Sequence, residues 1–149
     1  MKKLQFKVDI NAASSKVYDI MLGISNKSTY EQWTKIFNPT STYEGDWSKG
    51  SKMLFIGTNE GKLEGMVSEI VENIPHRYLS IRHYGILKSN IEITEGPEAE
   101  RWANGFENYI FDEKNGITSV IVNLDTIDEF LDYMNLTFPI ALQKLKEIC

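Results

Sequence analysis

The chain of 149 residues lacks most of the features that would assign a function directly. Its single cysteine is Cys149, so no disulfide can form within the chain. No apolar run has the length of a transmembrane helix or the pattern of a signal peptide. The 16 Lys and Arg residues against 21 Asp and Glu give a net charge of −5, which disfavours nucleic acid and anionic membrane surfaces. The sequence therefore predicts a cytoplasmic protein that neither binds nucleic acid nor inserts into a membrane.

Motifs for common cofactors and catalytic centres are also missing. The sequence has no zinc-ligand spacing, no phosphate-binding glycine loop, no dinucleotide fingerprint and no Gly-x-Ser-x-Gly. The acidic group of Glu92, Glu95, Glu98 and Glu100 has no metal-ligand spacing and is typical of a solvated surface. Cys149 lies at the terminus, where a nucleophile would not be held in place. We expect no cofactor and no metal ion.

What the chain does have is an ordinary apolar content and many aromatic residues. Apolar residues make up 42% of the chain, and its length suits a single domain, residues 1–149, with a sizeable core. Three Trp, seven Tyr and seven Phe give 11% aromatic residues. Amphipathic rings are suited to a binding pocket, but they also fill ordinary protein cores, so both interpretations are open for each ring.

The pattern along the chain predicts one strand, two short helices and then a series of strands. Residues 4–10 alternate between apolar and polar, which is typical of a half-buried strand. A first short helix follows residues 11–14, and a capping-box pattern at residues 28–31 predicts the start of a second. The later alternating segments are predicted strands: 43–47, 52–57, 62–72, 78–84, 106–112 and 118–125. Between residues 85 and 105 the pattern indicates only a turn at 95–97 and a helical turn at 99–103.

The last 24 residues predict a long amphipathic helix. Thr126 and Glu129 fit a capping box at its start. Nine apolar residues then recur at helical spacing and form one stripe: Ile127, Phe130, Leu131, Met134, Phe138, Ala141, Leu142, Leu145 and Ile148. Pro139 lies within this stripe, where it would either kink the helix or be the first residue of a new helix after a break near Thr137.

This order of elements indicates an α+β fold. Strands joined by short hairpins pair antiparallel, and one long terminal helix can lie across the whole sheet. A sheet that grips one long helix often leaves a hollow between the two, in which a small molecule could lie.

Four segments resemble the START-like (SRPBCC) superfamily, within it the group related to the activator of heat-shock-protein-90 ATPase, in its C-terminal domain. The matching residues are 13–18 and 30–33 in the two short helices, 44–51 with 65–70 and 75–79 in the hairpins, and 138–146 in the closing helix. The resemblance implies a helix-grip fold, in which a curved antiparallel sheet of six to seven strands encloses an apolar cavity against the C-terminal helix. Relatives bind lipids, sterols, polyketides or hormones, a minority are cyclases or aromatases, and one branch is a co-chaperone.

Two groups of residues are candidates for the site. The predicted cavity wall consists of Trp33, Phe55, Tyr109, Met134 and Phe138. A polar group is predicted from the alternation of side chains along strands, which places His83 on the face of Leu79 and Ile81, and Glu107 on the face of Tyr109 and Phe111. If the two strands pair, the side chains of His83, Glu107 and Tyr109 meet and can bind a ligand hydroxyl or move a proton. The alternative is that His83 and Glu107 lie at wet strand ends.

The residue patterns and the resemblance together imply three possible functions. The first is binding of an apolar or amphipathic small molecule, by a monomer or a homodimer. The second is a cyclase or aromatase reaction with His83, Glu107 or Tyr109 as acid or base. The third is a co-chaperone that binds a partner protein, although the chain lacks the larger N-terminal region expected of the eukaryotic activator.

Overall fold

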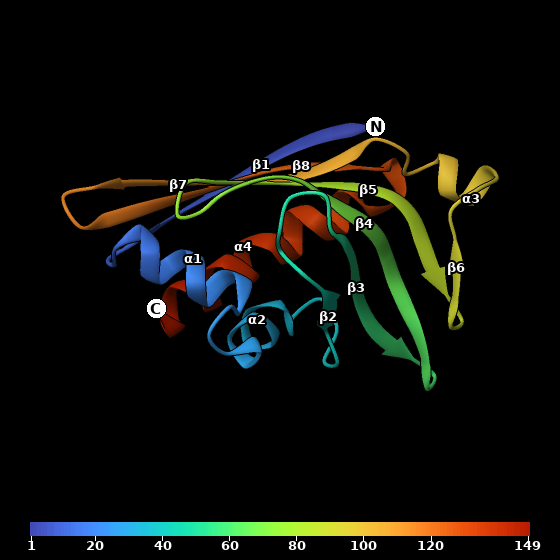
Figure 1. Ribbon diagram of the computed structural model, residues 1–149, viewed down its shortest axis with the longest axis horizontal. Coiled ribbons are helices and arrows are strands. Elements are labelled where there is room, and N and C mark those ends of the chain that lie inside the picture. Colours follow the sequence, from blue (N-terminus) through green and yellow to red (C-terminus); the bar gives the residue numbers. More distant parts are fainter.

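The computed structural model describes residues 1–149 and contains one eight-stranded antiparallel sheet, with the two short helices after the first strand and the long C-terminal helix on its concave side (Figure 1). The strands are β1 (Lys2–Ile10), β2 (Thr42–Gly45), β3 (Lys52–Asn59), β4 (Lys62–Ile74), β5 (Tyr78–Lys88), β6 (Ile91–Ile93), β7 (Gly105–Lys114) and β8 (Ile117–Thr126). The helices are α1 (Ser14–Leu22), α2 (Lys27–Thr34), the short α3 (Pro97–Glu100) and α4 (Leu131–Ile148), with the 3₁₀ turn η1 (Asp128–Phe130) before α4.

The strand order is β1-β8-β7-β5-β4-β3-β2, with β6 paired to β5 outside this path. The order confirms the predicted α+β helix-grip fold, in which the two short helices follow the first strand and the long helix closes the chain. The sheet has one strand more than the predicted six to seven. The additional strand is β6, a three-residue segment of the region 85–105, which is too short to show a period in the sequence.

The curvature of the sheet has identifiable causes. The pairing of β4 with β5 shifts register between Val67 and Ser68 and again between Ile70 and Glu72, and such bulges bend a strand. Gly65 has a φ of 157°, and a Cβ there would lie 1.9 Å from the carbonyl oxygen of Phe55, so only glycine allows β3 and β4 to approach as they do. Figure 1 shows β3, β4 and the end of β5 curling toward the helices.

Helix α4 lies against the concave face, where it packs on β1 and α2. The alternating residues of β1 and β8 supply one side of the core, and Phe138, Ala141, Leu142 and Leu145 of α4 supply the other. These four α4 residues belong to the predicted stripe, which is therefore confirmed for the C-terminal half of the helix. In the N-terminal half, Leu131 and Met134 are only half-buried, and Phe130 is exposed.

Helix α1 begins at Ser14 as predicted, but the two predicted capping boxes were wrong. Thr126 is the last residue of β8, paired with Lys2, and its hydroxyl makes no capping bond, while Glu129 pairs with Arg101. Helix α4 begins five residues after Thr126. Helix α2 is capped by Asn26, whose side-chain oxygen accepts a hydrogen bond of 3.0 Å from the backbone N–H of Ser28. Helix α4 continues through Pro139, so this proline does not start a new helix.

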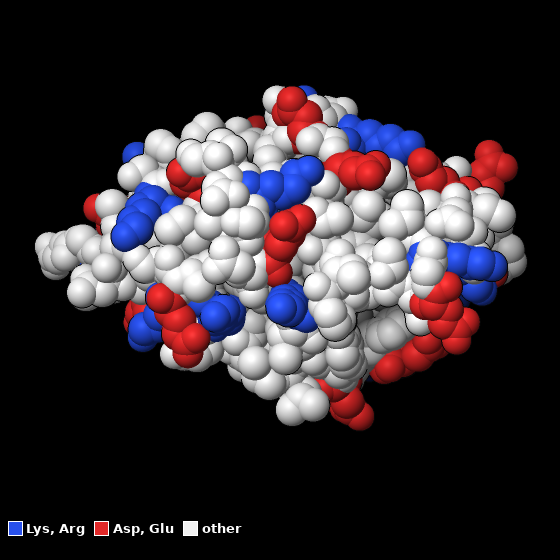
Figure 2. Space-filling view, turned by 90° about the horizontal axis from the view of Figure 1, so that it is seen from below, with Lys and Arg blue, Asp and Glu red and all other residues white.

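No helix has both the length and the apolar content needed to cross a membrane. Figure 2 views the molecule from the helix side and shows acidic and basic side chains interspersed rather than gathered by sign.

We expect Leu145→Ala to lower the free energy of unfolding by about 2–5 kcal/mol, because Leu145 is fully buried between α4 and the sheet and its removal leaves a cavity. Lys144→Ala is the matched control, since this neighbouring side chain is exposed and should change stability by no more than about 0.5 kcal/mol. Urea unfolding measures both variants. Equal, small changes would show that α4 does not pack on the sheet as described.

Candidate ligand pocket

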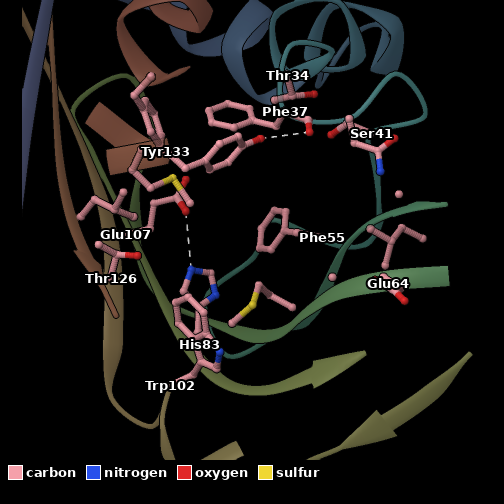
Figure 3. A pocket seen from close by; sticks show the side chains of 18 of the residues that line it. Thr34, Phe37, Ser41, Phe55, Glu64, His83, Trp102, Glu107, Thr126 and Tyr133 are labelled. Atoms are coloured by element: carbon pink, nitrogen blue, oxygen red, sulfur yellow. Dashed lines mark hydrogen bonds and ion pairs between the residues drawn. The ribbon is translucent and has the colours of Figure 1, made fainter. Parts of the chain in front are cut away.

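A pocket of about 270 Å³ lies between the concave face of the sheet and the helices α2 and α4 (Figure 3). Its wall consists of side chains from α2 and the loop after it, from β3, β4, β5, β7 and β8, and from the first turns of α4. Eight of the lining residues are aromatic: Tyr30, Trp33, Phe37, Phe55, Trp102, Tyr109, Tyr133 and Phe138. A pocket lined mainly by apolar and aromatic groups, with few polar ones, is typical of small-molecule sites.

The aromatic wall is held by packing and by hydrogen bonds to backbone. Trp33 is buried, its indole N–H donates to the carbonyl of Met21 at 2.8 Å, and its ring contacts that of Tyr109 edge-on. The Tyr133 hydroxyl donates to the carbonyl of Phe37 at 3.1 Å, which ties α4 to the loop after α2. Phe37 and Phe138 meet edge to face, with ring centroids 5.1 Å apart. These contacts fix the positions of the aromatic side chains in the wall.

A chain of polar side chains lies at one end of the pocket. Ser68 and His83 Nδ1 are 2.6 Å apart, and His83 Nε2 lies 3.5 Å from Glu107 Oε1. The other carboxylate oxygen of Glu107 accepts a hydrogen bond from the Tyr109 hydroxyl. Figure 3 shows His83 reaching from the sheet toward Glu107 across the polar end. Because these groups include both hydrogen-bond donors and acceptors, they can orient a ligand or transfer a proton.

The register of the sheet produces this convergence. In the pairing of β5 with β7, Leu79 lies opposite Tyr109 and Ile81 lies opposite Glu107, so the inward face of β5 continues directly to His83. Ser68 lies opposite His83 in the pairing of β4 with β5, one step after the first bulge. His83 is 5% exposed and is not at a wet strand end, whereas the Glu107 side chain is 20% exposed through the pocket.

The two buried tyrosines of the pocket are held in their neutral forms. Burial is the main cause that raises the pKa of Tyr109 well above its ordinary value, and the negative charge of Glu107 is the second. The same two causes, in the same order, raise the pKa of Tyr30. Both phenols therefore remain hydrogen-bond donors throughout the neutral range.

The segment that follows α3 forms the rest of the pocket wall. Trp102 lines the pocket and packs against Phe130 of η1, with ring centroids 5.8 Å apart. The neighbouring Arg101 pairs with Glu129 at 2.8 Å. These contacts join the segment between β6 and β7 to the turn that leads into α4.

All seven residues predicted as ligand-binding line this one pocket: Trp33, Phe55, His83, Glu107, Tyr109, Met134 and Phe138. Three of them, His83, Glu107 and Tyr109, form the predicted polar group, and their role in binding or catalysis stays a prediction. The acidic residues around α3 form no group able to hold a metal ion. Glu92 and Glu98 instead pair with Lys52 and Lys88.

Other residues of the site were not predicted. Ser68 is buried next to His83 and does not itself line the pocket. It was missed because a bulge sets its partner, and the sequence gives no sign of that bulge. Trp102 was missed because residues 85–105 show no period. Tyr133 precedes Met134 on α4 and falls outside the apolar stripe, but it lines the pocket.

Comparison with known proteins shows the fold. No family model and no curated protein sequence matches the chain. Among solved structures, the Aha1 dimer from Colwellia psychrerythraea is similar over 99% of this chain and 95% of that chain, with 16% identity and a TM-score of 0.65. CalU16 from Micromonospora echinospora matches over 98% of this chain and 73% of that chain, with 15% identity and a TM-score of 0.62. DynU16, a protein of the dynemicin biosynthetic locus, matches over 99% of this chain and 46% of that chain, with 11% identity and a TM-score of 0.68. At these identities the likeness establishes the helix-grip fold that the resemblance implied.

The tyrosine environments predict a loss of stability at alkaline pH. An unfolded tyrosine ionises near pH 10, while the folded protein holds Tyr30 and Tyr109 neutral above that. The stability from these groups is therefore fully present below about pH 10 and is lost as the pH rises beyond it, because only the unfolded chain releases the protons. Urea unfolding at a series of pH values should show this fall, and Tyr109→Phe should make it less steep. An identical slope in the variant would contradict the assignment.

Proposed function

We propose that the chain binds an apolar or amphipathic small molecule in the pocket between the sheet and α4. One observation carries the proposal: the aromatic hollow has a cluster of polar side chains, His83, Glu107 and Tyr109, at one end. Burial of apolar ligand surface would supply most of the affinity, at about 25 cal/mol per Å² before the cost of association. His83, Glu107 and Tyr109 would fix the orientation of the ligand through its polar end.

The fold neighbours support this proposal only in a general way. A helix-grip sheet can hold a hollow beneath its long helix, and this chain has one in that place. The neighbours' names identify no ligand, so the proposal depends on the side chains of this chain.

Binding of a dye tests the proposal when it is compared with a variant whose larger side chain fills the pocket. Nile red, an uncharged hydrophobic dye, should bind saturably with a rise in fluorescence. Met134→Trp should weaken this binding about tenfold or more, because a larger ring on the first turns of α4 takes up the space of the ligand. Leu136→Trp is the matched control, since Leu136 lies on the same helix but is 70% exposed and outside the pocket. Unsaturable binding, or equal affinity in both variants, would contradict the proposal.

A cyclase or aromatase reaction in the same pocket is the second candidate. The observation that favours it is the continuous chain from Ser68 through His83 and Glu107 to Tyr109, which has the acid and base groups that an aldol cyclisation with loss of water requires. An enzyme of this class would act on a polyketone chain, whose polar carbonyl groups would lie toward His83.

The enzyme candidate predicts that the protein converts a polyketone thioester to a product lighter by one water, as detected by mass spectrometry. His83→Gln should slow the conversion about a hundredfold, the size of a typical general acid–base contribution. His76→Asn is the control, since His76 lies in the exposed turn between β4 and β5. Equal rates for the two variants would remove His83 from the reaction.

The co-chaperone role stays a prediction from the resemblance. Leu136 and Ile140 are exposed on the outer side of α4, but two side chains one turn apart do not identify a partner.

A further inference from the structure

The charged groups of the pocket are almost all of one sign. Three carboxylates line it, those of Glu64, Glu107 and Asp125, and no Lys or Arg does. Asp125 is already compensated, because it accepts from Lys3 Nζ and from the backbone N–H of Phe106, both at 3.0 Å. Glu64 lies on β4 away from the polar end, as Figure 3 shows. The charge that faces the ligand at the polar end is therefore that of Glu107.

Glu107 has no cationic partner other than His83. The distance of 3.5 Å to His83 Nε2 is long for a hydrogen bond, so the Tyr109 hydroxyl is the only close donor to this carboxylate. An ionised carboxylate can accept about four hydrogen bonds. Glu107 therefore has free acceptor capacity, and its side chain is exposed through the pocket.

A second observation concerns the same end of the pocket. The Thr126 hydroxyl is fully buried and has no hydrogen-bond partner, one of only two such side-chain groups in the chain. Thr126 lines the pocket, and Figure 3 shows its oxygen directed toward the polar end near Glu107. Buried hydroxyl groups are nearly always paired, so the unpaired Thr126 hydroxyl adds to the unused polar groups at this end of the pocket.

Building on the proposed function, we infer that the pocket selects ligands whose polar end is a protonated amine over ligands of the same size that end in a carboxylate. The ammonium group of such a ligand donates to the Glu107 carboxylate, and its apolar body lies against the aromatic wall. A carboxylate in the same place meets a like charge with no Lys or Arg to offset it.

Three probes with one apolar body test the inference by isothermal titration calorimetry at neutral pH. They are 2-(aminomethyl)naphthalene, 2-naphthalenemethanol and 2-naphthoate, which end in a cation, a neutral hydroxyl and an anion. The amine should bind more tightly than 2-naphthoate by about tenfold or more, the size expected of one hydrogen bond to a charged group. The alcohol should lie between the two.

Glu107→Gln should remove most of this preference, because it keeps the shape and the contact with Tyr109 but removes the charge. Glu44→Gln is the matched control, since Glu44 is exposed on β2 outside the pocket. If the preference for the amine is unchanged in Glu107→Gln, another group causes it and the inference is wrong. The comparison of the three probes on the unmodified protein does not depend on the variant folding.

The outcomes separate this inference from the proposed function. If 2-naphthoate or the alcohol binds as tightly as the amine, the charge inference is wrong and the proposed binding of small molecules stands. If none of the probes binds and Nile red does not bind either, both fail.

Discussion

The uneven packing of α4 on the sheet is the constraint on which the pocket depends. In the second half of the helix, Phe138, Ala141, Leu142 and Leu145 are buried against β1 and the sheet core. In the first half, Tyr133 and Leu136 are exposed and Met134 is half-buried. The second half of the helix is therefore packed in the core, whereas the first half borders the pocket through Tyr133 and Met134. Because the sheet curls toward the helices at β3 and β4, the space under the first turns of α4 is enclosed from a second side.

The polar chain inside this space depends on the same geometry. A carboxylate in an apolar hollow is costly unless it is hydrogen-bonded, and Glu107 has Tyr109 and His83 as partners only because β5 and β7 pair in one register. A slip by one residue would turn His83 to the outer face. The register is in turn fixed by Leu79, Ile81 and Phe111, whose side chains must stay in the core.

The sequence predicted the elements whose pattern is regular. Alternation in β1 and β8, the hairpins and the helical period of α4 all give strong signals, and side-chain parity brought His83, Glu107 and Tyr109 to one face. The sequence did not predict the features that depend on tertiary contacts. Thr126 looked like a helix cap, but pairing with Lys2 extends β8 through this residue and delays the helix to Leu131. The position of Ser68 follows from a bulge in β4, and that of Trp102 from packing on Phe130, and neither leaves a period in the sequence.

Methyl NMR measures the central claim most directly, because the five methionines sample different parts of the molecule. Met66 and Met134 line the pocket, Met21 and Met53 are buried elsewhere, and Met1 is exposed. With the methionine methyl groups labelled with ¹³C, addition of 2-naphthalenemethanol should give contacts between the naphthyl protons and the methyl groups of Met66 and Met134. The methyl groups of Met21, Met53 and Met1 should show none. Contacts confined to Met1, or no contacts with any methyl group at saturating probe, would contradict the presence of a binding pocket beneath α4.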